Sequence, residues 1–221
     1  MQKLTSPFDL IKKAVNTFVI KENAVFLVKI YAPLAVFSVI SVIQSYLPAS
    51  IRNSNSVWLF IAVAFLQILY FLTSVFIGVS GILALRKVVD GGELSLKKTY
   101  RSAWKNYWIL LLLSIILALI YVFGFALLIV PGMLFVVWFA FSRFMAVEKN
   151  LGVKEALLKS KGLVKGMYWK TLGRLLVFGF FTVIVQMVLS VIPYGLGSVA
   201  STLLGGLYML PLYLLYKEVS S

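Results

Sequence analysis

The chain has 221 residues, of which 62% are hydrophobic and only 13% are charged. A soluble domain is roughly 45–50% apolar and about 25% charged, so the composition excludes a water-soluble fold, which could not bury this much apolar surface. The net charge is +14, and the absence of cysteine and histidine excludes disulfides, thiol chemistry and Cys/His metal sites.

The N-terminal segment predicts a short helix ahead of the first apolar run. Ser6, Pro7 and Asp9 have the order of an N-cap residue, a proline in the first turn and an acidic residue near the helix start. One apolar run then extends over residues 24–47, and another over residues 57–85 ends at two basic residues. Because about 20 apolar residues cross the hydrocarbon core, each run predicts one span.

A second basic segment, residues 94–105, precedes the longest uncharged part of the chain. Its apolar residues recur at i, i+3, i+4 and i+7 with the bases on the other side, which predicts an amphipathic helix. No charge occurs from Tyr107 to Ser142, and one helix of that length would exceed the bilayer at ~1.5 Å per residue. We therefore expect a third and a fourth span, with a turn within residues 124–132 and Pro131 in the first turn of the fourth.

A third basic segment, residues 152–165, carries a narrower apolar stripe and predicts another amphipathic helix. The fifth span is expected near residues 167–192 and the sixth near residues 194–216. The fold class is therefore all-α: a polytopic bundle of about six transmembrane helices with three cytoplasmic amphipathic helices, in a single integral membrane domain.

The order of elements also suggests a threefold pseudo-repeat, in which each basic arm is followed by a helical hairpin. The three units are residues 1–87, 88–147 and 148–217. The similarity among them is weak, so chance resemblance of basic amphipathic segments stays an alternative.

The bases determine the expected orientation. With six crossings, every lysine and arginine except Arg52 falls on one face, which the positive-inside rule makes cytoplasmic. We therefore expect a multi-pass protein of the cell inner membrane with both termini in the cytoplasm. Arg143 is expected to extend toward the same headgroups. The residues expected to contact anionic lipid headgroups are Lys97, Lys98, Arg101, Lys105, Lys154, Lys159, Lys161, Lys165, Lys170, Trp104, Trp108 and Trp169.

The sequence contains few residues that could carry out catalysis. All seven acids lie outside the expected spans, and no nucleotide-binding or hydrolase motif is present. We therefore expect no enzyme activity, no catalytic or metal-binding residue and no cofactor. Small residues four apart predict close helix packing, either within the monomer or between the copies of a homo-oligomer. They are Ser74 and Gly78 on the second span and Gly197, Ser201 and Gly205 on the sixth.

The stretch from Ile129 to Gly173 resembles a known family. It resembles the membrane domain attached to some bacterial glycerophosphodiester phosphodiesterases, and the stand-alone YciC-like inner membrane proteins. The resemblance implies an integral membrane protein of about six helices with no established activity; the phosphodiesterase activity belongs to a separate soluble barrel and does not carry over. The matching residues are Pro131, Gly132, Glu155, Ala156, Leu157, Ser160, Gly166 and Trp169.

Two functions remain open on these observations. The first is a non-catalytic membrane protein whose basic cytoplasmic face engages anionic membrane lipids or a partner protein. The second is a small-solute permease or channel, in which the polar residues within the spans would line the pathway of the solute. A net charge of +14 is also compatible with nucleic acid as a partner. Nucleic acid is not the expected partner, because bases that flank apolar runs favour lipid headgroups.

Overall fold

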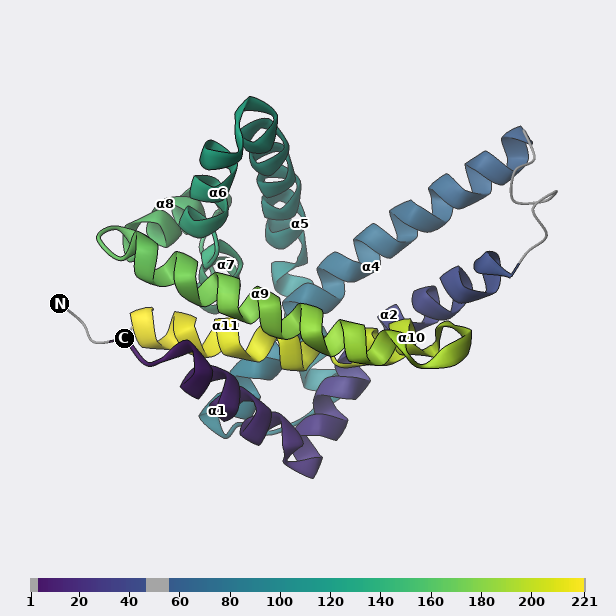
Figure 1. Cartoon of the computed structure of the whole chain (residues 1–221), viewed down its shortest axis with the longest axis horizontal. Coiled ribbons are helices and arrows are strands. Elements are labelled where there is room, and N and C mark those ends of the chain that lie inside the picture. The colour runs from purple at the N-terminus through teal and green to yellow at the C-terminus, as the bar shows by residue number, and fades with distance from the viewer. Residues whose placement is uncertain (1–3, 47–55, 221) are drawn as a thin grey trace.

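The structure, a computed structural model, describes residues 4–46 and 56–220, and every regular element among them is helical (Figure 1). Six helical segments are long and apolar enough to cross a membrane. The all-helical, six-span fold class is therefore confirmed. The elements are α1 (Pro7–Val19), α2 (Lys21–Ser45), α4 (Val57–Asp90), α5 (Leu96–Leu127), α6 (Ile129–Trp138), α7 (Ser142–Glu148), α8 (Val153–Val164), α9 (Tyr168–Ser190), η1 (Pro193–Gly195), α10 (Leu196–Leu203) and α11 (Gly205–Ser220).

The fourth and sixth spans are not single helices. The fourth consists of α6 and α7, and the sixth consists of η1, α10 and α11. The turn between the third and fourth spans is at Leu128, whose backbone is extended, within the predicted range. Pro131 lies in the first turn of α6, where backbone N–H groups have no intrahelical acceptor and a proline removes no hydrogen bond.

The three basic arms differ in form. The first and third are separate helices, α1 and α8, each with one buried side. The second, residues 94–105, is continuous with the third span, because α5 begins at Leu96 and runs without interruption to Leu127. No glycine or proline separates Leu96 from Tyr107, so nothing breaks the helix where the sequence changes from amphipathic to apolar.

Three hairpins extend from one shared end of the molecule. In Figure 1 the pair α5–α6 and the pair α2–α4 diverge from each other, while α9 lies beside α11. The shared end holds α1, α8 and the ion pair between Lys217 and Asp90 at 3.1 Å, and we call it the basic end. The opposite end, where the hairpins turn, is the far end.

The tightly packed core lies toward the basic end. Its largest fully buried side chains include Phe141, Phe144, Tyr213 and Tyr216. By contrast, only 11% of the most apolar stretch of α4 and 6% of that of α9 are buried. Long apolar helices with this much exposed surface are stable only when lipid covers them, so the protein is a multi-pass membrane protein.

Candidate functional site

The second arm presents its bases and its tryptophans to the outside. Thr99, Ala103 and Tyr107 form the buried side of this part of α5. The predicted headgroup residues on the other sides are exposed: Lys97, Lys98, Arg101, Lys105, Trp104 and Trp108.

One of these bases already has a partner. The Lys98 ammonium lies 2.6 Å from the Glu93 carboxylate. This hydrogen bond and the charge of Lys98 hold the pKa of the Glu93 carboxyl below its usual range. The pair competes with a headgroup for Lys98, but the pair is exposed and therefore weak.

The third arm has the same two-sided character. Ala156, Ser160 and Val164 form the buried side of α8. Lys161 lies over the Trp138 ring, 4.2 Å from its centre, in a cation–π contact. The predicted headgroup residues of this region are all exposed: Lys154, Lys159, Lys161, Lys165, Lys170 and Trp169.

Ser160 joins the third arm to the broken fourth span. Its hydroxyl donates a hydrogen bond to the Trp138 carbonyl at 2.8 Å and accepts one from the Phe141 amide at 3.2 Å. These two backbone groups lie at the interruption between α6 and α7. Ser160 is therefore a structural residue that stabilises the break, a role that sequence spacing alone does not reveal.

The small residues of the sixth span pack within the monomer. A side chain at Gly197 would overlap the Leu189 carbonyl, and one at Gly205 would come within 2.5 Å of the Tyr31 ring. The Ser201 hydroxyl lies 3.2 Å from that of Tyr208. These contacts account for the small side chains without a second copy of the chain.

Ser74 and Gly78 on the second span have different surroundings. Both line a cavity of about 90 Å³ where α4, α5, α7 and α11 meet. Arg143 of α7 lines the same cavity, together with Ser114 of α5 and Met209 of α11. Arg143 is exposed, and its predicted extension toward the headgroups stays a prediction.

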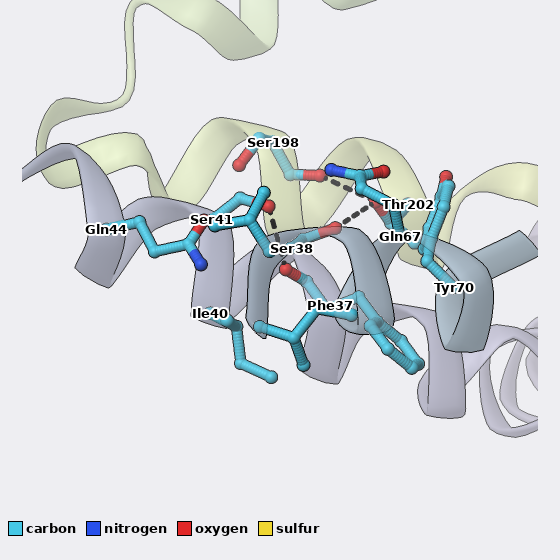
Figure 2. Close-up of a pocket in the computed structure, with 11 residues that line it drawn as sticks. Phe37, Ser38, Ile40, Ser41, Gln44, Gln67, Tyr70, Ser198 and Thr202 are labelled. Carbon is cyan, nitrogen blue, oxygen red and sulfur yellow. Dashed lines mark hydrogen bonds between the residues drawn. The ribbon is translucent and has the colours of Figure 1, made fainter. Parts of the chain in front are cut away.

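A second cavity, of about 290 Å³, lies toward the far end between α2, α4 and α10 (Figure 2). Ser38 and Thr202 join across it by a hydrogen bond of 2.7 Å. Gln44, Gln67 and Tyr70 also line it, and their side chains make no hydrogen bond with any described residue. This wall is polar but uncharged.

Among the described residues, no group of three or more aspartate, glutamate, histidine or cysteine side chains is placed to hold a metal ion. Comparison of the chain with protein-family models, with known proteins and with solved structures finds no match. The resemblance to the glycerophosphodiester phosphodiesterase membrane domain therefore stays a prediction.

Proposed function

We propose that this multi-pass protein resides in the cell inner membrane, with the basic end and both termini in the cytoplasm, and that its exposed bases bind anionic lipid headgroups without catalysis. The observation that carries the proposal is the arrangement of the second and third arms. Both bury an apolar side against the bundle and expose bases next to tryptophans. Interfacial tryptophan beside lysine is the composition that suits the headgroup region.

The orientation can be tested by labelling, because the chain has no cysteine of its own. A cysteine replacing Tyr194, which is exposed at the far end, is expected to react with a membrane-impermeant thiol reagent in intact cells. A cysteine replacing Lys97 at the basic end is expected to react only after the membrane is opened. Ser160 is unsuitable as a reporter because it is fully buried. Labelling of position 97 from outside would overturn the orientation.

The expected strength of lipid binding follows from the number of exposed bases. Each base near an anionic surface contributes about 1 kcal/mol, and physiological salt screens it over about 8 Å. The spans already hold the protein in the bilayer, so this attraction selects neighbouring lipids rather than anchoring the protein.

A charge-reversal variant tests lipid binding directly. Lys97, Arg101, Lys154 and Lys159 make no ion pair and no side-chain hydrogen bond with any described residue, so their replacement by glutamate breaks no such contact. The variant is expected to lose salt-sensitive enrichment of anionic lipid around the purified protein. The matched control exchanges lysine and arginine at the same positions, which keeps every charge, and is expected to retain the enrichment.

Three results would contradict the proposal. Unchanged lipid enrichment in a correctly oriented glutamate variant would leave the bases with a role in membrane insertion alone. Loss of a copurifying protein, with lipid enrichment unchanged, would assign the basic face to a protein partner. Steady turnover of a substrate by the pure protein would refute the non-catalytic part of the proposal.

The polar cavity at the far end supports a second candidate, a small-solute permease. Its uncharged amide and hydroxyl groups suit a neutral polar solute. Uptake of a labelled neutral solute by proteoliposomes, lost in a Gln67→Leu variant, would favour transport over lipid binding. Absence of uptake across a panel of such solutes would remove this candidate.

A further inference from the structure

Arg143 is an exposed residue that lines a cavity between the spans. The cavity that it lines is bordered by Ser74 of α4 and Ser114 of α5. At a rise of about 1.5 Å per residue, Ser74 is about 18 Å along α4 from Arg86, and Ser114 is about 14 Å along α5 from Lys105. Because the hydrocarbon core is about 30 Å thick, these depths place the cavity near the middle of the membrane.

The direction of α7 turns the arginine away from the basic end. Arg143 is the second residue of α7, which begins at Ser142 and runs toward the basic end, where it ends at Glu148. Side chains on a helix tilt toward its N-terminus, so Arg143 extends away from the basic end. It is close enough to Tyr121, further along α5, to act on it electrostatically. A cation in the first turn also opposes the helix dipole, so Arg143 does not stabilise α7.

No described residue neutralises this charge. Arg143 makes no ion pair and no hydrogen bond within residues 4–46 and 56–220. Asp90 is paired with Lys217 and Arg86, and Glu148 accepts a hydrogen bond from Tyr213. A guanidinium stays charged under all ordinary conditions. An intramembrane charge without a counter-charge is costly, and such residues commonly mark a binding site.

A second polar group in the cavity lacks a partner as well. Ser114 is only 8% exposed, and its hydroxyl makes no hydrogen bond with any described residue. The cavity, of about 90 Å³, has room for a ligand that would bond this hydroxyl, since a single water needs only about 10–15 Å³. Arg143 and Ser114 therefore direct unused hydrogen-bond donors toward the same space.

We propose that the cavity between α4, α5 and α7 binds a phosphate group, with Arg143 as the charged ligand and Ser114 as a hydroxyl donor. The planar guanidinium presents two parallel N–H groups that match phosphate oxygens, and the charge-assisted bonds gain strength at low dielectric. This inference goes beyond the proposed role of the arms, because neither residue belongs to them.

The phosphate group could belong to a lipid headgroup or to free phosphate, and the surroundings of the cavity favour a lipid. Phe71, which lines the cavity, is 40% exposed, and Ile115, next to Ser114, is 43% exposed. The cavity therefore lies beside apolar surface that acyl chains cover. Figure 1 shows the α5–α6 pair diverging from α4, which leaves the apolar far halves of α4 and α5 open to the bilayer.

The test measures binding of phosphatidylglycerol to the purified full chain in nonionic detergent. At about 1 M salt the screening length falls to about 3 Å, which suppresses binding to the exposed arms. Under these conditions Arg143→Gln is expected to bind about 10- to 100-fold more weakly than the native chain, as for the loss of a charge-assisted hydrogen bond. Arg101→Gln, which removes one exposed base from α5, is the matched control and is expected to bind like the native chain.

Competition with inorganic phosphate identifies the source of the phosphate group. Displacement of the lipid by inorganic phosphate supports a cavity that also takes the free anion, and lipid binding without displacement supports the lipid alone. The proposal is overturned if Arg143→Gln and Arg101→Gln bind both probes equally.

Thermal unfolding in lipid-free detergent separates binding from folding. Removing an uncompensated charge is expected to leave the unfolding midpoint of Arg143→Gln unchanged or raised. A lowered midpoint would mean that the guanidinium has a structural partner in the folded chain, and would also overturn the proposal. Ser114→Ala, which keeps the charge, is expected to weaken lipid binding less than Arg143→Gln does.

Discussion

Replacing Ser160 with alanine is expected to lower the free energy of unfolding by about 1–3 kcal/mol. Ser160 is fully buried, and its hydroxyl serves the Trp138 carbonyl and the Phe141 amide at the same time. Alanine removes the one side-chain atom that satisfies two backbone groups. Both groups lie at the interruption between α6 and α7. In an unbroken helix, each would have had its own backbone partner four residues away.

The size of this effect can be estimated from two different energies. Hydrogen bonds between side chains in membranes average only about 0.6 kcal/mol, because unfolded helices in the bilayer find other partners. The penalty for leaving a buried polar group unpaired is about 1–3 kcal/mol. Since the Ser160→Ala variant leaves backbone groups of a folded, buried break without a partner, the second figure applies.

The assay is equilibrium unfolding in mixed micelles, followed by tryptophan fluorescence. The matched control is Ser190→Ala, because the Ser190 hydroxyl is exposed and bonds only the Met187 carbonyl of its own helix at 2.7 Å. The control is expected to change the unfolding free energy by less than about 0.5 kcal/mol. Equal unfolding free energies for the two variants would refute the argument from the break.

Further outcomes follow from other contacts. Gly197→Ala is expected to cost about 1–3 kcal/mol or more in unfolding assays, because its Cβ would overlap the Leu189 carbonyl, without altering the oligomeric state. Gly179→Ala on α9, which meets no neighbouring atom, is expected to be neutral or stabilising by up to about 1 kcal/mol; equal losses for both would refute the packing argument. Lys98→Gln is expected to raise the pKa of Glu93 toward its ordinary value in an NMR titration, and an unchanged pKa would show that the pair does not form in solution. Because the pKa of Glu93 is lowered in the fold, the small stabilisation from this pair is present above the ordinary carboxyl pKa and is lost as the pH falls through the lowered value.

The number and order of the spans could be predicted because they depend on local composition. Long uncharged runs bounded by bases identify spans without knowledge of their neighbours. The division of the third from the fourth span followed from length alone, and the turn at Leu128 lies within the predicted range. The two-sided character of α1 and α8 was likewise a matter of periodicity.

The second arm shows where periodicity is insufficient. Residues 94–105 have the pattern of a surface helix, but they continue directly into α5. An amphipathic pattern reveals which side of a helix is buried and does not reveal where the helix ends. Helix ends depend on breaking and capping residues, and the segment between Leu96 and Tyr107 contains no glycine or proline.

The depth of Arg143 depends on contacts between distant segments. α7 is unbroken from Ser142 to Glu148, so Arg143 lies about 8 Å along the helix from Glu148 whether or not the span is interrupted before it. The break between α6 and α7 sets the direction of α7, and with it the place of Arg143 against α4 and α5; Ser160, from the following helix, stabilises that break. If this coupling holds, Ser160→Ala should also weaken the salt-resistant binding of phosphatidylglycerol that we assign to Arg143, although it changes no charge. Ser190→Ala should not weaken it, and equal binding by the two variants under conditions where both are folded would show that the break does not position the arginine.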